Sequence, residues 1–240
     1  MPATTGISAV PMARPGGEAQ LGPVPGFFLS SSAHAEAKGT PIMQLSGLVE
    51  PDRWLHVPGL IVGARVFGPS GDSPGEPYAG YRRTLWDGVS IGAVMYGTSK
   101  RSTQKLASYH ATRFGGEAAL DAKLWESDWF GLHVQGAVAA TRIFASGSYC
   151  VDMMGIAKDC DEMNPATNTM VDGKQTGIYP AGTGTVALDF AKGRDGFFDG
   201  ARLALMFATG SMPMLANGTK TGSDVYAAGG LTLTLGIADN

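Results

Sequence analysis

The sequence has few charged side chains and no long uninterrupted apolar stretch. Charged residues make up 16% of the 240 residues, and 18 Lys and Arg stand against 21 Asp and Glu, for a net charge of −3. Nucleic-acid binding needs a basic surface, which this balance does not supply, so we expect no nucleic-acid partner. Charged residues, Pro or Gly interrupt every apolar run before the roughly 20 residues that a membrane-spanning helix needs. Hydrophobic residues still make up 44% of the chain, which excludes general disorder.

Cysteine is nearly absent as well. The two cysteines, Cys150 and Cys160, lie close together in a polar stretch. We expect them to close a small loop by a disulfide in an oxidising compartment, with two thiols in a cytosolic loop as the alternative. Their surroundings lack the CxxC spacing and the His partners of a zinc or redox site. The first 21 residues show no continuous apolar segment of the signal-peptide kind.

Recognisable metal-enzyme motifs are also missing. HExxH does not occur, and the four histidines show no metal-ligand spacing. The nearest candidate pair is Ser108 with His110, which share one face of a strand, although a polar loop root explains them more simply. Residues 150–169 offer oxygen ligands for Ca²⁺, but their spacing matches no EF-hand and an acidic solvated loop is the ordinary explanation. We predict a protein that is not an enzyme and has neither metal nor cofactor.

Glycine is abundant, with 35 residues, roughly twice its ordinary share, and much of it falls within alternating segments. In the clearest segment, residues 113–124, every second side chain from Phe114 to Leu124 is apolar or small, and Glu117 and Asp121 lie between them. Such alternation predicts a β-strand with one apolar and one charged face. The same pattern predicts eight strands, at about residues 60–66, 78–85, 89–95, 113–124, 130–141, 185–190, 201–207 and 230–237.

The connections between these strands alternate in length. Short turns are predicted at residues 86–88, 126–128 and 193–196. Longer polar loops are predicted at residues 68–77, 98–109, 146–177 and 211–224. Short turns at one end and long loops at the other describe an up-and-down meander whose two ends face different surroundings.

Aromatic residues collect at the predicted strand ends. One group lies by the short turns and comprises Trp54, Trp86, Trp125, Trp129, Phe197 and Phe198. A second group lies at the opposite strand ends and comprises Phe67, Tyr96, Phe114, Phe144, Phe207 and Tyr226. Two aromatic belts around an apolar band are typical of a transmembrane barrel, because amphipathic rings favour the two water interfaces.

In its alternation, turn asymmetry and belts, the segment from Arg53 to Ile237 resembles the small bacterial outer-membrane β-barrels of the OmpA/OmpX type. The resemblance implies an all-β fold: a closed, antiparallel, up-and-down transmembrane barrel, since hydrocarbon offers no partner to an unpaired backbone group. An even strand count and short periplasmic turns would place both termini in the periplasm and the disulfide loop at the cell surface. Barrels of this kind commonly end on an aromatic residue, whereas this chain ends on Ala238-Asp239-Asn240.

We predict eight strands for this barrel, with ten as the alternative. Residues 1–20 are expected to form a disordered tail, residues 21–52 a periplasmic segment or an additional β-hairpin, and residues 53–240 the barrel. The hairpin is suggested by alternation over residues 43–49 and by a candidate strand over residues 27–37.

The polar face of the strands would point into the lumen of the barrel. At eight strands the lumen is just wide enough for side chains to fill it, so we expect opposite charges to form a packed ion-pair network rather than a wide pore. The predicted network consists of Arg65, Arg82, Glu117, Asp121, Lys123, His133, Asp189 and Arg202.

The expected function is that of a non-enzymatic integral protein of the bacterial outer membrane, with a structural or surface-exposed role. Its expected partners are outer-membrane lipid and the barrel-assembly machinery, and no small-molecule ligand is identified. One alternative is a small pore or transporter, in which the lumen charges gate a narrow conductance. The other is a soluble lipocalin-like barrel that binds an apolar ligand, which requires Leu120, Val134 and Leu233 to point inward.

Overall fold

Strands make up almost all of the chain that the computed structural model describes, namely residues 17–22, 26–30, 44–51, 55–67, 75–104, 107–127, 129–152, 157–158, 168–190, 198–215 and 221–237. They are β1 (Gly17–Gly22), β2 (Gly26–Ser30), β3 (Gln44–Val49), β4 (Leu60–Phe67), β5 (Glu76–Trp86), β6 (Val89–Gln104), β7 (Ala107–Glu126), β8 (Phe130–Asp152), β9 (Ala157–Lys158), β10 (Asn168–Phe190), β11 (Phe198–Leu215) and β12 (Thr221–Ile237). Within these ranges no helix has the length and apolar character needed to cross a membrane.

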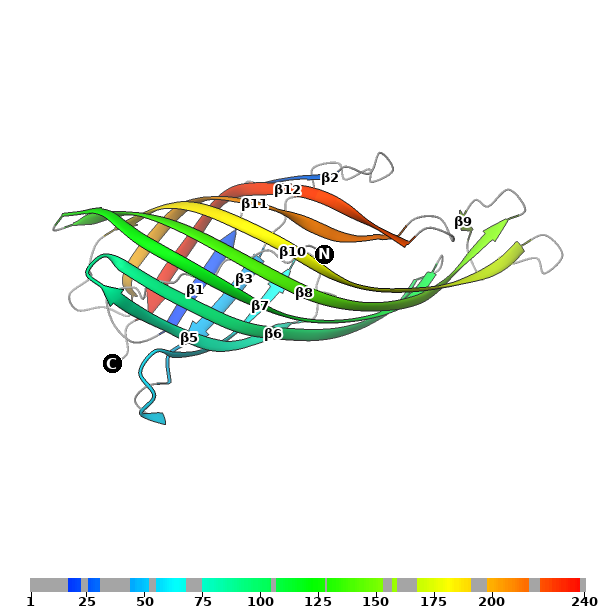
Figure 1. The fold of residues 1–240 in the computed structure, drawn as a ribbon, viewed down its shortest axis with the longest axis horizontal. Helices are drawn as coiled ribbons and strands as arrows, with labels where there is room; N and C mark the ends of the chain where they lie inside the picture. Colours follow the sequence, from blue (N-terminus) through cyan, green and yellow to red (C-terminus); the bar gives the residue numbers. More distant parts are fainter. Residues whose placement is uncertain are drawn as a thin grey trace.

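The sheet closes into a barrel of ten strands because β1 pairs with both β3 and β12 (Figure 1). The order around the barrel is β1-β3-β4-β5-β6-β7-β8-β10-β11-β12, and all pairings are antiparallel. The closing ladder joins β1 to residues 233–237 of β12, and β2 continues along the same edge by pairing with residues 226–230. β9 is a short addition to β8.

The predicted count of eight strands is therefore wrong, and the ten-strand alternative is confirmed. The eight predicted strands correspond to β4–β8 and β10–β12, and β1 and β3 supply the two further positions. β3 coincides with the alternation at residues 43–49, but β1 begins at Gly17, inside the segment 1–20 that we expected to be a tail. The sequence of β1, GEAQLG, has too little alternation to be recognised, and pairing on both of its edges makes it a strand.

Several strands continue well past their apolar stretches. β6 and β7 remain paired out to residues 104 and 107, and β8 and β10 out to residues 152 and 168. Much of the predicted loops 98–109 and 146–177 is therefore strand, because ladder hydrogen bonds form between backbones whatever the polarity of the side chains. The short turn at residues 86–88 is where we predicted it, and β7 ends at Glu126 and β8 begins at Phe130, on either side of the predicted turn at residues 126–128. The turn at residues 193–196 lies outside the described residues.

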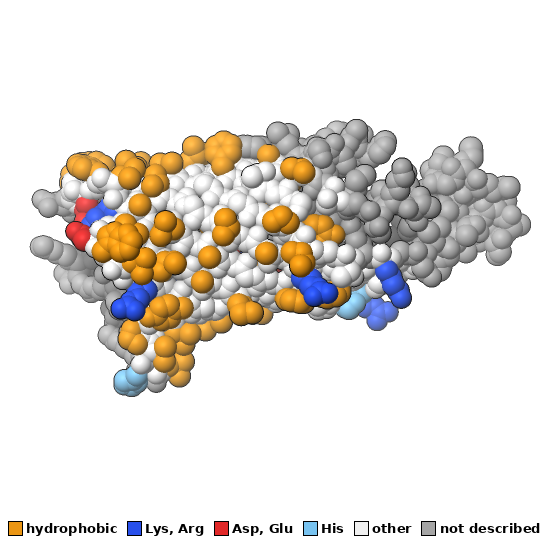
Figure 2. All heavy atoms as spheres, viewed as in Figure 1, with side chains coloured by type: hydrophobic (Ala, Val, Ile, Leu, Met, Phe, Trp, Pro, Cys, Tyr) orange, Lys and Arg blue, Asp and Glu red, His pale blue; other side chains and the backbone are white. Residues whose placement is uncertain are grey.

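Side chains alternate across the wall of the barrel as the sequence predicts. Leu120 is 52% exposed on the outside of β7, whereas its neighbour Asp121 is 1% exposed inside. Leu233 is also exposed, and Val134 lies on the same face of β8 as exposed Val138. The lipocalin-like alternative, which requires Leu120, Val134 and Leu233 to point inward, is therefore wrong. Figure 2 shows apolar side chains spread over the visible wall, with charged side chains towards its two ends.

The apolar band has the height of a membrane's hydrocarbon layer. On β7 it runs from Phe114 to Trp125, both exposed. At ~3.4 Å per residue this is roughly 37 Å of strand, or about 26 Å of height at a tilt of ~45°. Transmembrane barrels carry an apolar band of about 25 Å.

Inside the barrel, two tyrosines lie over glycines on the neighbouring strand. Tyr78 is paired with Gly63 and Tyr96 with Gly115. A Cβ atom at Gly63 would come within 2.4 Å of the Tyr78 ring, and one at Gly115 within 2.7 Å of the Tyr96 hydroxyl. Both positions therefore require glycine, and the rings cover the backbone that glycine leaves bare.

Leu120 lies halfway up the apolar band, so a charge at this position tests whether lipid or water covers the outer wall. Leu120→Lys is expected to destabilise the barrel in phospholipid vesicles by about 2–4 kcal/mol, because it places a charge at the middle of the hydrocarbon. The control Leu124→Lys, near the short-turn rim, is expected to cost about 0–1 kcal/mol. Urea unfolding in vesicles measures both, and equal effects at the two depths would contradict a lipid-covered wall.

Candidate functional site: the charged lumen

Arg65 on β4 is the centre of one charged group in the lumen. It is 1% exposed, its Nε donates to Oε2 of Glu76 on β5 at 2.5 Å, and its Nη1 lies 3.7 Å from Oε2 of Glu117 on β7. Its guanidinium also lies over the ring of Tyr96, 4.4 Å from the centroid. Arg113 on β7 approaches the other oxygen of Glu76 at 2.8 Å. Two arginines and two glutamates from three strands thus balance one another in charge.

Arg82 on β5 is the centre of a second group. Its Nη1 donates to Oε1 of Glu18 on β1 at 2.8 Å, and its Nε donates to Glu50, directly after β3. All three side chains are almost completely buried. The group ties β5 to two strands on the far side of β4, and its two carboxylates exceed its one cation.

His133 on β8 joins a third group. Its Nδ1 lies 3.1 Å from Oδ1 of Asp121 on β7, and its Nε2 lies 3.3 Å from Oδ2 of Asp189 on β10. Arg202 on β11 holds Asp189 through two hydrogen bonds of 2.5 and 2.7 Å. A doubly protonated imidazole donates to both carboxylates, whereas a neutral ring donates to only one. Four consecutive strands of the wall are cross-linked in this way.

A small cavity remains between these groups. Its volume is about 30 Å³, and its lining includes Glu117, Gln135, Thr185, Arg202 and Thr234. That volume holds roughly two water molecules.

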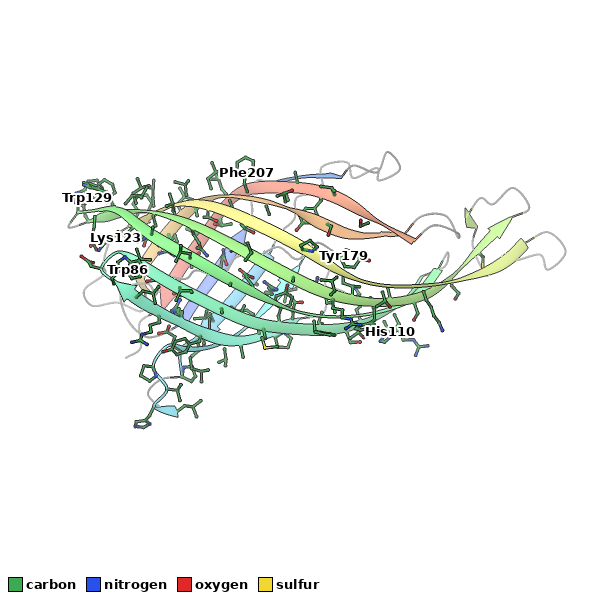
Figure 3. The ribbon with its side chains drawn as sticks, in the orientation of Figure 1. Trp86, His110, Lys123, Trp129, Tyr179 and Phe207 are labelled. Carbon is green, nitrogen blue, oxygen red and sulfur yellow. The ribbon has the colours of Figure 1, made fainter. Side chains whose placement is uncertain are left out.

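The predicted lumen charges belong to these groups, with Lys123 as the exception. Its side chain is 26% exposed, and Nζ donates to Asp87 at 3.2 Å and to Glu126 at 2.8 Å. The placement of Lys123 in the lumen network is therefore wrong. A bulge between Lys123 and Trp125 ends the regular alternation of β7, so this side chain reaches the rim with the short turns (Figure 3).

Sequence reasoning missed four members of the network: Glu18, Glu50, Glu76 and Arg113. Glu18 lay in the expected tail, and Glu50 and Glu76 lay in expected connections. Arg113 could have been found, because it lies on the charged face of the most clearly alternating segment. The three glutamates carry no comparable local signal. Glu18 lies on a strand without clear alternation, and Glu50 and Glu76 lie just outside the alternating segments 43–49 and 78–85.

Of the predicted aromatic belt at the short turns, the structure describes the side chains of three tryptophans, and all three are exposed. Trp86, Trp125 and Trp129 are 63%, 49% and 66% exposed, and the rings of Trp125 and Trp129 lie 4.3 and 4.6 Å from Phe130. Figure 3 shows Trp86 and Trp129 at the same end of the barrel. Trp54, Phe197 and the side chain of Phe198 lie outside the described part of the chain.

The second belt is smaller than predicted. Phe114, Phe144 and Phe207 are exposed on the outside, and Phe114 stacks on Phe144 at 5.9 Å. Placing Tyr96 and Tyr226 in this belt is wrong, because both are buried in the lumen. They lie on the inward face by alternation, and Tyr96 is hydrogen-bonded to Thr141 at 2.6 Å. The side chain of Phe67 is outside the described residues.

The remaining candidate sites are only partly described. Cys150 on β8 is fully buried, whereas Cys160 lies outside the described residues, so the disulfide stays a prediction. The ring of His110 lies 3.0 Å from the hydroxyl of Ser99, and the side chain of Ser108 is not among those described. No cluster of three or more His, Cys, Asp or Glu that could hold a metal occurs in the described ranges.

Comparisons with known proteins add little to the interpretation of this chain as a membrane β-barrel. No family model matches the chain, and no curated protein matches it in sequence. Among solved structures, Ail, the attachment invasion locus protein of Yersinia pestis, has a TM-score of 0.33 at 7% identity, covering 92% of this chain and 99% of that one. The CymD monoaromatic hydrocarbon channel has a TM-score of 0.29 at 9% identity, covering 93% and 89%. Structural similarity at such low TM-scores does not support a functional conclusion. The interpretation as a membrane barrel therefore rests on the strand pairing and on the apolar outer and charged inner faces of the wall.

The buried third group generates a test of the network's contribution to stability. Arg202→Met leaves Asp189 without its bidentate partner and is expected to lower the free energy of unfolding by about 3–5 kcal/mol. Adding Asp189→Asn is expected to recover part of that loss. The control Lys123→Met breaks an exposed pair and is expected to cost under ~1 kcal/mol. Denaturant titration followed by tryptophan fluorescence compares them, and an Arg202→Met loss no larger than the control would rule out a stabilising network.

Proposed function

We propose that this protein is a non-enzymatic integral β-barrel of the bacterial outer membrane with a lumen closed by paired charges. The observation that carries the proposal is the polarity of the wall, which is apolar outside and charged inside. Large exposed side chains such as Met95, Val138 and Ile178, at 74%, 67% and 66%, would be costly if water covered the wall. Lipid removes that cost, and the closed ladder leaves no barrel strand unpaired in hydrocarbon.

The two ends of the barrel support a structural or surface-exposed role. In the proposed orientation the short turns face the periplasm and the long paired hairpins face outward, as is usual for such barrels. The longest hairpin, β8–β10, carries Cys150 and the predicted disulfide. Outer-membrane lipid and the barrel-assembly machinery are the proposed partners, and the described residues show no assembled catalytic group.

The proposal is tested by locating and unfolding the protein. Expressed with an export signal in a Gram-negative host, it should sediment with the outer membrane. It should also migrate differently on a detergent gel with and without boiling, because a closed barrel resists the detergent until heated. A protein that stays soluble and monomeric without detergent would overturn the proposal.

A narrow channel is the second candidate function. The cavity beside Glu117 and Arg202 favours it, because a space of water size lined by charged and polar residues interrupts the side-chain packing of the lumen. The carboxylates of the network also outnumber its arginines, which would favour cations over anions.

Conductance separates the two candidates. We expect wild-type protein in a planar bilayer to show no current steps, because paired side chains fill the lumen. The double variant Asp189→Ser/Arg202→Ser removes both side chains of one lumen ion pair together and is the control expected to conduct. Wild-type steps that change with Arg65→Gln or Asp121→Asn would favour the channel instead.

A further inference from the structure

The outward face of β6, β7, β8 and β10 changes character in three successive cross-strand rows at the end away from the short turns. The first row contains a belt phenylalanine and comprises Gly97, Phe114, Arg142 and Ile178. The second row is largely hydroxylic and comprises Ser99, Thr112, Phe144 and Thr176. The third row is largely basic and comprises Arg101, His110, Ser146 and Lys174. From the first row to the third, the outward side chains of the wall thus change from largely apolar to largely hydroxylic and then to largely basic.

Arg142 extends the basic row towards the belt. Its guanidinium carbon lies 4.9 Å from the centroid of the Phe144 ring, so the charge is held over the aromatic residue next to the basic row. Its position in the first row places its backbone at the level of Phe114, and the long side chain carries the charge away from the apolar band. We call Arg101, His110, Arg142 and Lys174 the basic patch. Figure 2 shows Lys, Arg and His side chains together at this end of the wall, and Figure 3 labels His110 there.

The described carboxylates offer the basic patch no counter-charge. Those in the lumen belong to the three groups above, and Asp87 and Glu126 lie at the short turns, at the opposite end of the band. No ion pair joins Arg101, Arg142 or Lys174 to a carboxylate of the described chain. All three cations are exposed on the outside of the wall. Asp172 lies two residues from Lys174 on the same strand, and its side chain is outside the described part of the chain. Among the described side chains the patch carries cations only, so an external anion can be its counter-charge.

The position of the patch indicates which anion fits. Adjacent strands lie ~4.8 Å apart, so the row from Arg101 to Lys174 is roughly 14 Å wide. It begins directly beyond exposed Phe114 and Phe144, which stack on each other at the edge of the apolar band. An anion bound here would have its charge at the patch and an apolar part against the phenylalanines. A membrane lipid with a phosphate in its headgroup has both parts in this order.

We propose that the basic patch binds the phosphate-bearing headgroups of lipids in the leaflet beside the long hairpins. Arginine binds phosphate through two parallel N–H donors, and lysine binds it as a point charge. The acyl chains of the same lipid would pack along the outer faces of β7 and β8 below the belt. This inference rests on the proposed membrane location and adds a lipid preference to it.

The test is lipid retention by the refolded full chain, read by native mass spectrometry from micelles that contain phosphatidylglycerol and phosphatidylcholine in equal amounts. Wild type is expected to retain phosphatidylglycerol preferentially. Each of Arg101→Gln, Arg142→Gln and Lys174→Gln is expected to reduce that preference about fivefold, since a cation near an anionic surface contributes about 1 kcal/mol. The control Arg83→Gln removes an exposed cation near the short-turn rim and is expected to leave the preference unchanged.

Four other results of this experiment would overturn the inference. Equal retention of both lipids by heat-modifiable, inserted protein overturns the lipid site alone and leaves the membrane location intact. An equal loss with Arg83→Gln shows that any exposed cation suffices, and displacement by millimolar inorganic phosphate shows a site for free phosphate rather than for a lipid. A chain that does not become heat-modifiable in any lipid overturns the proposed function together with this inference.

Discussion

The ladder that closes β1 onto β12 is the constraint on which the rest of the structure depends. A sheet with an apolar outer face can stand in hydrocarbon only if it has no open edge, because lipid cannot pair with backbone N–H and C=O groups. The closing strand has a weak strand sequence, GEAQLG, and owes its conformation to β3 on one side and β12 on the other. Ten strands, rather than eight, follow from this one pairing.

Closure of the barrel also buries the polar face of the sheet in the lumen. Once the sheet is a barrel, side chains such as Arg65 and Asp121 are removed from water and must be paired, since an unpaired buried charge costs several kcal/mol. Their partners come from strands far apart in sequence, as when Arg82 on β5 meets Glu18 on β1. A slip of one residue in any strand would turn these charges towards the apolar side, so the network also specifies the register.

The two ends of the apolar band differ because the strands end differently. At the short turns, exposed tryptophans lie beside Lys123 and its acidic partners, and charges of both signs are present. At the other end the strands continue in paired hairpins, and the described outward charges are cationic. This asymmetry is visible only when the cross-strand register aligns residues such as Arg101 and Lys174, which lie far apart in the sequence.

The sequence by itself determined the strand character, the two faces of the wall and the turn asymmetry, because period-two alternation in segments such as residues 113–124 is a local property. It also placed most of the lumen charges, from Arg65 to Arg202, on the correct face. Only the tertiary structure decided the strand count, the contribution of Glu18, Glu50 and Glu76, the exclusion of Lys123 from the network, and the inward position of Tyr96 and Tyr226. The physical reason is that β1 and the partners of each buried charge are set by pairing between distant strands, and a bulge or a closing ladder has no signature in the residues of one strand alone.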